Sequence, residues 1–228
     1  PVGATDACAY AGAYLEQAGL PLTDHPSPEV THVLLDAPSF APDGSLRGGG
    51  SLSGVLERLP PGLMVIGGKL KHPALSGHPV LDLLRDDEYL AKNAAITAQC
   101  ALRIAGSLLP TVPPDTPALV IGWGRIGKCL GKLLGAVGCP VTIAARNPAD
   151  RAMIKALGQQ AVDIPRISEI LPDVRLLFNT APSPVLGADL LDKYKKCLKM
   201  DLASQPGLEG CDIIYARGLP GQYAPESS

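Results

Sequence analysis

Short apolar runs alternate with amphipathic stretches along the N-terminal part of the chain. The runs at residues 32–37 and 62–68 are bounded by proline or glycine, as is typical of buried parallel strands. Residues 7–19 and 52–59 carry apolar side chains at helical spacing. Strands that alternate with helices form parallel sheets, so the pattern predicts a Rossmann-like α/β lobe over residues 1–90.

The longest helical stretch covers residues 86–109 and is rich in alanine and leucine. Asp86 and Asp87 stand in its first turn, where negative charge stabilises the helix dipole. Four prolines follow within residues 110–117, and a proline-rich segment is a stiff linker. We therefore expect an interdomain helix and linker over residues 91–111.

A glycine motif begins the second half of the chain. An apolar strand leads into Gly122, Gly124 and Gly127, and an amphipathic helix, Gly138 and a second strand follow. The first glycine permits a tight turn, the second lets a pyrophosphate approach the backbone, and the third lets the helix pack on the strand. A glycine-rich turn without a ligand is the alternative, but the flanking elements favour a dinucleotide-binding Rossmann domain over residues 112–216.

The end of the second strand indicates which dinucleotide binds. An NAD site carries Asp or Glu at this point, whereas here Ala145 is followed by Arg146 and Asn147. Arg146 can pair with a 2′-phosphate, and Arg151 lies one helical turn farther on. These residues favour NADP, although Arg146 could equally be a solvated loop cation.

Two later strands, at residues 175–180 and 198–202, end in polar loops that we expect to border the nicotinamide. The loop side chains could instead be strand-end caps and turn formers. The complete set of predicted cofactor contacts is Gly122, Trp123, Gly124, Arg125, Ile126, Gly127, Arg146, Asn147, Arg151, Asn179, Thr180, Ala181, Ala203 and Ser204.

Composition narrows the class of protein. The chain has 228 residues, a net charge of −2 and 46% apolar residues, without the basic stripe of a nucleic-acid binder. No apolar run approaches the roughly 20 residues needed to span a bilayer, and no signal peptide is visible, so we expect a cytoplasmic protein that binds neither membrane nor nucleic acid. Six scattered cysteines without a C-x-x-C pair predict neither a metal site nor disulfides.

Three C-terminal segments, Phe178–Leu186, Asp201–Gly207 and Ala216–Pro225, resemble the signature of the A subunit of dipicolinate synthase. The glycine motif is similar to the cofactor loop of that family, and residues 85–97 are similar to its interdomain helix. The resemblance covers nearly the whole chain and is weakest before residue 60.

The resemblance implies an NADP-dependent oxidoreductase that forms dipicolinate from a dihydrodipicolinate-type precursor during sporulation. It also implies a partner, the B subunit of dipicolinate synthase, and we expect a homo-oligomer. The whole pattern predicts two Rossmann-like, doubly wound parallel-sheet lobes with a substrate cleft between them, and a C-terminal segment at residues 217–228 that returns toward the first lobe.

Substrate chemistry suggests further site residues. Two substrate carboxylates require cations, and the candidates are Lys69, Lys71, Arg85 and Arg217, each of which could also be a plain surface charge. Asn93 and Thr97 share one face of the interdomain helix and could bind substrate or could be packing residues. The predicted catalytic residues are Asn93, Thr97, Ser204 and Arg217.

Other functions remain open. All four histidines precede residue 80, so the histidine acid/base that a 2-hydroxyacid dehydrogenase needs after its last strands is missing. The Asn-Val-Thr-x-Pro-like stretch of a shikimate dehydrogenase is also missing. Oxidation of a dihydropyridine fits better because it creates an aromatic ring and needs less acid–base assistance. A regulatory module that senses NADPH without catalysis is the alternative from another class.

Overall fold

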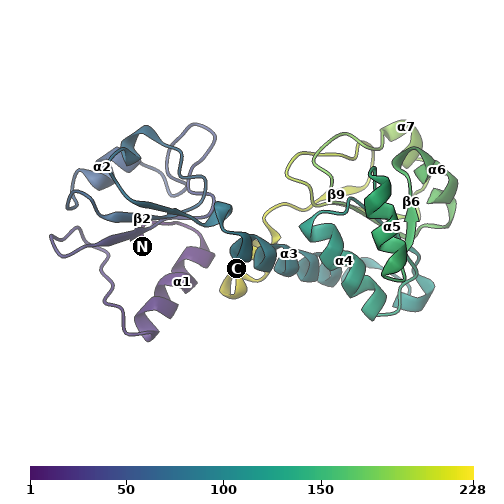
Figure 1. Ribbon diagram of the computed structural model, residues 1–228, viewed down its shortest axis with the longest axis horizontal. Coiled ribbons are helices and arrows are strands. Elements are labelled where there is room, and N and C mark those ends of the chain that lie inside the picture. Colours follow the sequence, from purple (N-terminus) through teal and green to yellow (C-terminus); the bar gives the residue numbers. More distant parts are fainter. The chain divides into compact units, whose positions relative to one another are not determined.

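The computed structural model describes residues 1–228. The chain divides into two compact units, unit 1 formed by Pro1–Asn93 together with Pro220–Ser228, and unit 2 formed by Ala94–Leu219. Each unit contains a parallel β-sheet with helices packed on it (Figure 1). The predicted α/β class, with a parallel sheet in each half of the chain, is therefore confirmed.

Unit 1 is built on three parallel strands in the order β1-β2-β3. Its strands are β1 (His32–Leu34), β2 (Met64–Gly67) and β3 (Val80–Asp82), and its helices include α1 (Asp6–Gln17) and α2 (Leu52–Leu56). The strand order follows the chain, so the reversal expected of a doubly wound sheet occurs only in unit 2. β3 lies outside the predicted strands because its apolar stretch is only Val80 and Leu81, which are followed by Asp82.

The core of unit 1 lies around β1 and β2. Val33, Leu35 and Val65 are buried there with Leu52 from α2. The last residues of the chain belong to the same unit, where the short 3-10 helix Pro225–Ser227 packs against α1. The C-terminal residues therefore pack as part of unit 1.

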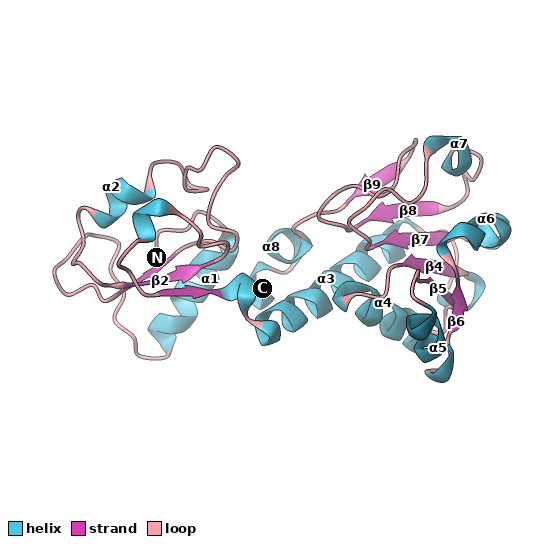
Figure 2. Ribbon diagram, turned by 45° about the horizontal axis from the view of Figure 1, so that its top comes forward, coloured by secondary structure: helices cyan, strands magenta, loops and turns pink.

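Unit 2 has a six-stranded parallel sheet in the order β6-β5-β4-β7-β8-β9 (Figure 2). Its strands are β4 (Ala118–Ile121), β5 (Val141–Ala144), β6 (Gln160–Val162), β7 (Leu176–Asn179), β8 (Leu198–Asp201) and β9 (Ile213–Tyr215). The chain progresses outward from β4 in one direction and then returns to β7 and progresses in the other. This reversal places a topological switch point between β4 and β7, where ligands bind in open α/β sheets.

Helices cover both faces of the second sheet. They are α3 (Asp87–Leu108) from Ala94 onward, α4 (Arg125–Ala136), α5 (Pro148–Ala156), α6 (Ile167–Ile170) and α7 (Ala188–Leu191), whereas α8 (Leu219–Tyr223) belongs to unit 1 from Pro220 onward. Successive strand side chains point to opposite faces, so Ile143 of β5 faces α4, while Ala144 joins a core with Ile167 of α6 and Leu191 of α7. Six short 3-10 helices complete the fold, at Pro73–Leu75, Leu83–Arg85, Pro113–Asp115, Ile164–Arg166, Leu171–Asp173 and Pro225–Ser227.

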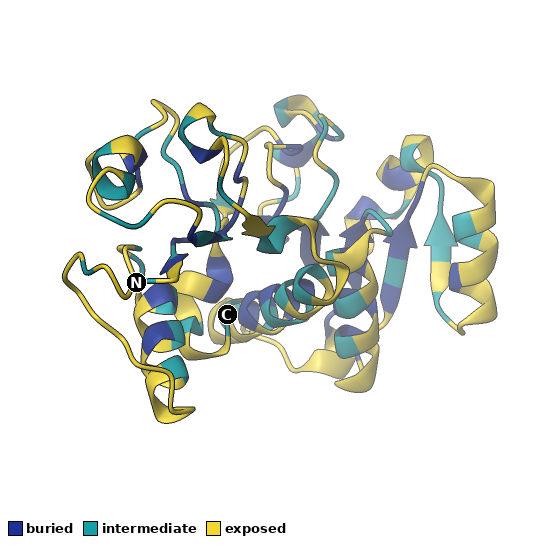
Figure 3. Ribbon diagram, turned by 60° about the vertical axis from the view of Figure 1, so that its left-hand side comes forward, coloured by how far each residue is buried: buried dark blue, intermediate teal, exposed yellow.

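The long helix α3 starts in unit 1 and continues in unit 2 from Ala94 onward. Ala94, Ala98, Ala101 and Ala105 are all buried, and they form one stripe because residues three and four apart lie on the same helix face. The buried stripe is visible on α3 in Figure 3, and small side chains there let the helix pack closely. Neither α3 nor any other helix combines the length and apolar character needed to cross a membrane.

Candidate functional site

The turn between β4 and α4 is the centre of the candidate nucleotide site. All four residues of β4 are buried, and Gly122 follows with a φ of +104°, which L side chains rarely adopt. A Cβ added to Gly122 would also lie 2.5 Å from Thr180 Oγ1. A Cβ added to Gly127 would overlap the carbonyl oxygen of Gly122. Two of the three motif glycines are therefore required by the packing of the turn itself.

Gly124 differs from the other two glycines. No atom lies within 4 Å of a Cβ added there, and Gly124 itself is exposed. It is the N-cap of the 12-residue helix α4, and no side chain caps this helix end. The start of α4 therefore has uncapped N–H groups beside open space at Gly124, and such a helix end is the arrangement that binds a pyrophosphate. The residues present fit a dinucleotide at this turn.

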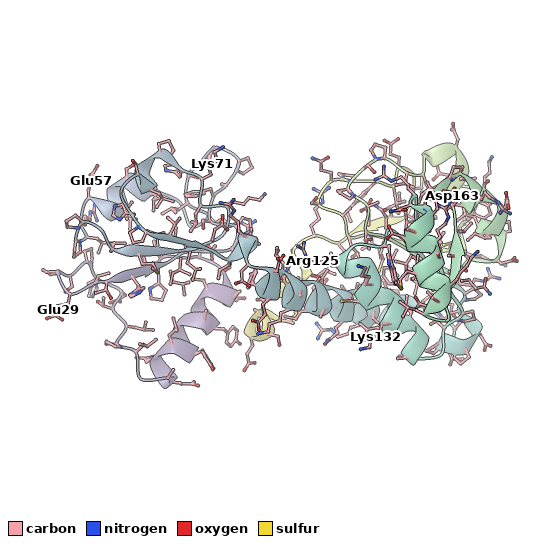
Figure 4. All side chains as sticks on the ribbon, viewed as in Figure 1. Glu29, Glu57, Lys71, Arg125, Lys132 and Asp163 are labelled. Carbon is pink, nitrogen blue, oxygen red and sulfur yellow. The ribbon has the colours of Figure 1, made fainter.

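Side chains of the turn flank this space. Arg125 is the exposed first residue of α4, and Lys132 lies farther along the same helix (Figure 4). Trp123 is half-buried, and the ammonium of Lys128 lies 5.8 Å from the centroid of its ring. Ile126 is also half-buried, so its side chain packs while its backbone stays in the first turn of α4.

The end of β5 carries the predicted contacts for a 2′-phosphate. Arg146 is exposed and directly follows the buried Ala145. The side chain of Asn147 caps α5 by accepting a hydrogen bond of 2.9 Å from the backbone N–H of Ala149. The amide oxygen of Asn147 therefore stabilises the start of α5, whereas Arg146 is an exposed residue.

Arg151, the second predicted phosphate contact, is used within the fold. Its Nη1 donates to the carbonyl oxygens of Ala145 at 2.7 Å and Arg146 at 2.6 Å. The same nitrogen lies 3.2 Å from the carboxylate of Asp163, which follows β6. These bonds hold the turn after β5 and fix the backbone from which Arg146 projects. Sequence reasoning missed Asp163, because only the pairing of β5 with β6 brings it next to Arg151.

The ends of β7 and β8 are joined by a buried polar pair. Asn179 and Asp201 are opposite each other in the register of these strands, and they are 0% and 1% exposed. Asn179 Nδ2 donates to Asp201 Oδ1 at 3.0 Å. The predicted contact Asn179 therefore lies inside the protein with its amide bonded, and Asp201, which was not among the predicted site residues, is its partner.

The loops after β7 and β8 carry the other predicted nicotinamide contacts. Thr180 Oγ1 donates to the carbonyl oxygen of Ile121 at 2.9 Å, which ties the β7 loop to the end of β4. Ala181 is half-buried, Ala203 is buried and Ser204 is exposed. The structure thus brings Thr180 against the glycine turn and leaves Ser204 at the surface of the same strand edge.

The remaining predicted residues lie outside this cluster. Thr97 is buried on α3 in unit 2, and Asn93 is half-buried on the part of α3 that belongs to unit 1. Arg217 is exposed between β9 and α8. The exposed Lys69 has a φ of +58°, and its N–H donates to Asp82 Oδ1 at 3.0 Å. Lys71 and Arg85 are exposed in unit 1.

Neither of two surface hollows of unit 2 is lined by Gly124 or by the loops after β7 and β8. One lies along β6 and is lined by residues that include Arg151, Lys155 and Arg166. The other lies between α4 and α5, with Trp123 and Met153 among its lining residues. The assignment of the nucleotide site therefore rests on the backbone donors and open space at Gly124 rather than on concavity.

The cysteines and metal-ligating side chains form no constellation of their own. All six cysteines are unpaired, and no group of three or more His, Cys, Asp or Glu side chains could hold a metal ion. Burial raises the pKa of Cys197 to about 11, so this thiol stays protonated at neutral pH.

Comparison with known proteins supports the resemblance found in the sequence. No family model matches the chain. The chain is 27% identical over 158 residues to the A subunit of dipicolinate synthase from Bacillus subtilis (strain 168), with 65% of this chain and 53% of that protein covered. It is 26% identical over 145 residues to glutamyl-tRNA reductase of Aliivibrio fischeri (strain MJ11), with 62% of this chain and 33% of that protein covered. The chain therefore spans about half the length of the first relative (53%) and a third of the length of the second (33%).

Solved structures show the same fold. The dipicolinate synthase A subunit from Bacillus halodurans superposes with a TM-score of 0.75 and 23% identity, covering 86% of this chain and 75% of that one. Its counterpart from Bacillus subtilis gives a TM-score of 0.71 at 22% identity, covering 90% and 75%. A transhydrogenase from Sinorhizobium meliloti gives 0.70 at 15% identity, covering 95% and 76%. The chain is therefore similar in sequence to the A subunit of dipicolinate synthase and has the fold of these Rossmann-type proteins.

Proposed function

We propose that this chain is an NADP-dependent oxidoreductase that converts a dihydrodipicolinate-type precursor to dipicolinate during sporulation. One observation carries the nucleotide part of the proposal: the N-terminus of α4 has no side-chain cap, and the space in front of Gly124 is open. The substrate part is carried by the similarity to the A subunit of dipicolinate synthase. The six unpaired cysteines are compatible with the reducing cytoplasm, where we place the reaction.

The nucleotide would be held at both ends of its adenosine half. The N–H groups of Arg125, Ile126 and Gly127 would bind the pyrophosphate, which the positive end of the α4 dipole also favours. Arg146 would pair with the 2′-phosphate from a backbone that Arg151 fixes through two carbonyl oxygens. A carboxylate in place of Arg146 would repel that phosphate, so this position selects NADP over NAD.

The nicotinamide half of the nucleotide would lie against the loops after β7 and β8. Thr180, Ala181, Ala203 and Ser204 occupy the carboxyl edge of the sheet, where nicotinamide rings bind in this fold. Bound NADP supplies the hydride acceptor. The substrate ring would lose a hydride to the nucleotide and a proton to solvent, and so become aromatic, and Ser204 would orient by a hydrogen bond the water molecule that takes up the proton.

The absence of a histidine in unit 2 fits this reaction. All four histidines, His25, His32, His72 and His78, belong to unit 1. A ring that becomes aromatic loses its proton without a strong base, whereas a hydroxyacid substrate requires one. Arg217 would bind a substrate carboxylate, and Asn93 and Thr97 of α3 would hydrogen-bond substrate or cofactor. We further propose a homo-oligomer that works with a B subunit of the dipicolinate synthase type.

The test is an absorbance assay of NADPH formation. Dihydrodipicolinate made in situ is added to the protein with NADP⁺, with and without a candidate B subunit. Substrate-dependent formation of NADPH is the expected result, and NAD⁺ should support a lower rate. If NADPH binds saturably but no turnover occurs under either condition, the chain is a nucleotide-sensing module rather than an enzyme.

A further inference from the structure

The carboxylate of Asp201 holds the loop after β8 at both of its ends. Oδ1 accepts a hydrogen bond from the N–H of Ala203 at 3.0 Å. Oδ2 accepts from the N–H of Gly207 at 2.7 Å and from that of Leu208 at 2.9 Å. Between these two ends, residues 204–206 are exposed. One buried side chain therefore determines where this exposed loop tip stands.

Asn179 connects the same carboxylate to the loop after β7. Its Nδ2 donates to Asp201 Oδ1 at 3.0 Å and to the carbonyl oxygen of Ala181 at 3.1 Å. Its Oδ1 accepts from the N–H of Ala181 at 3.1 Å. Both polar atoms of the side chain are thus bonded, and the two strand-end loops are fixed to each other through the pair.

Gly207 closes the arrangement from the other side. A Cβ added there would lie 2.5 Å from Asn179 Nδ2, 2.6 Å from the carbonyl oxygen of Ser183 and 2.9 Å from that of Ala181. Its own carbonyl accepts from the N–H of Val185 at 2.8 Å. The end of the β8 loop therefore packs directly on the β7 loop, without room for a methyl group.

We infer that Asn179 and Asp201 are positioning residues for the nicotinamide half of the nucleotide site. They act through the two loops and do not touch the nucleotide themselves, because both side chains are buried. This inference rests on the proposed function, which places a nicotinamide at these loops. The adenosine half binds at the α4 turn and at Arg146, so it does not depend on the Asn179–Asp201 pair.

The substitution Asp201→Asn separates the two halves of the site. The carboxylate accepts four hydrogen bonds, two on each oxygen. In asparagine one of these oxygens becomes an NH₂ group, which would face two N–H donors and can accept from neither. One end of the loop is released while the volume of the side chain is kept. We therefore expect a local change at the loops after β7 and β8.

The measurement compares two ligands of the full chain by calorimetric titration. NADPH occupies both halves of the site, whereas adenosine 2′,5′-bisphosphate occupies the adenosine half alone. In the Asp201→Asn variant we expect the dissociation constant for NADPH to rise on the order of tenfold, since charge-assisted hydrogen bonds that order the loops are lost. The constant for the bisphosphate should stay within about twofold, because its phosphates bind elsewhere.

Two further variants test whether the effect is specific to the loops after β7 and β8. Gly207→Ala keeps the charge of Asp201 but pushes the loops apart, so it should weaken NADPH selectively in the same way. Asp192→Asn carries the same chemical change at a different strand edge, where Asp192 Oδ1 accepts from the N–H of Cys211 at 2.7 Å just before β9 begins. This control should leave both dissociation constants unchanged.

The outcomes distinguish this inference from the proposed function. A selective loss of NADPH affinity in Asp201→Asn or, if that variant does not fold, in Gly207→Ala supports the positioning role. Equal losses for both ligands, or no loss for either, overturn the positioning role of Asn179 and Asp201. The proposal that the protein binds NADP is unaffected by these outcomes. An unmutated protein that binds neither ligand overturns the proposed function and the positioning role together.

Discussion

The guanidinium of Arg151 lies 3.2 Å from the carboxylate of Asp163 and joins the turn after β5 to the end of β6. The same group donates to the carbonyl oxygens of Ala145 and Arg146. Of the two arginines in this region, Arg151 therefore supports the turn, and the exposed Arg146 is the one available to a ligand. The two residues should respond differently to substitution.

Arg146→Asp should narrow or reverse the preference for NADPH over NADH. A charge-assisted pair with the 2′-phosphate contributes about 1.5–3 kcal/mol, or on the order of tenfold to a hundredfold in affinity. The aspartate would repel the phosphate and could instead bind the 2′-hydroxyl of NADH. The dissociation constants of both nucleotides, measured by fluorescence titration, check this. Equal dissociation constants for NADPH and NADH in the unmutated protein would show that Arg146 does not bind the 2′-phosphate.

Arg151→Met should weaken NADPH binding by a smaller factor. The methionine keeps much of the aliphatic volume but removes the bonds to two carbonyl oxygens and to Asp163, so the turn that carries Arg146 becomes mobile. A loss of roughly threefold to tenfold is expected, since the phosphate contact itself remains. Lys155→Met, on the exposed face of the same helix, is the matched control and should change nothing. A loss as large as that of Arg146→Asp would assign the phosphate contact to Arg151.

The sequence predicted those features that depend on residues close together along the chain. Gly122 and Gly127 could be assigned their roles because a tight turn and a close helix approach need glycine whatever the rest of the fold does, whereas the pyrophosphate role of Gly124 stays a prediction. The long helix α3 was also predicted within two residues of its ends, at 86–109 against Asp87–Leu108, because its alanine-rich pattern is continuous.

The features that were missed depend on tertiary pairing. Asp201 is 22 residues from Asn179 along the chain, and only the β7–β8 register brings the two side chains together. Arg151 and Asp163 meet in the same way through β5 and β6. The edge strand β9 was missed because its apolar run, Ile213–Tyr215, has only three residues. Residue spacing alone could not show these contacts.

Cys197 and Cys211 should differ strongly in reactivity. The thiolate is the reactive form, and burial raises the pKa of Cys197 to about 11, whereas Cys211 is exposed. With an excess of a disulfide reagent at neutral pH, Cys211 should be labelled rapidly in the native protein and Cys197 only after unfolding. Mass spectrometry of labelled peptides gives the site. Rapid native labelling of Cys197 would contradict its burial.

The same pKa shift predicts a loss of stability in alkali. The pKa of Cys197 is raised from 9.0 to about 11, so folding favours the protonated thiol. Its contribution is complete below pH 9.0 and is lost as the pH rises toward about 11. Cys197→Ala should show a weaker fall in the free energy of unfolding across this range than the unmutated protein. Parallel curves for the two proteins would mean that Cys197 does not titrate in this window.

Substitutions at Gly124 and Gly127 should separate ligand binding from folding. A side chain at Gly124 meets no protein atom within 4 Å, and the backbone there, with φ of −79° and ψ of −169°, is extended and open to any residue. Gly124→Val should therefore fold normally, with a melting temperature within a few degrees of the unmutated protein. The valine would occupy the space of the pyrophosphate, so NADPH binding should be abolished.

Gly127→Ala is the opposite case. Its methyl group would overlap the carbonyl oxygen of Gly122, so α4 must move away from β4, at a cost of about 3 kcal/mol for an overpacked contact. This variant should lose both stability and NADPH affinity, as measured by thermal unfolding and calorimetric titration. The pair of variants is decisive because the two glycines lie three residues apart in one turn. Retained NADPH binding in Gly124→Val would show that the open space before α4 is not the pyrophosphate site, and a failure of that variant to fold would make Gly124 a structural residue like Gly127.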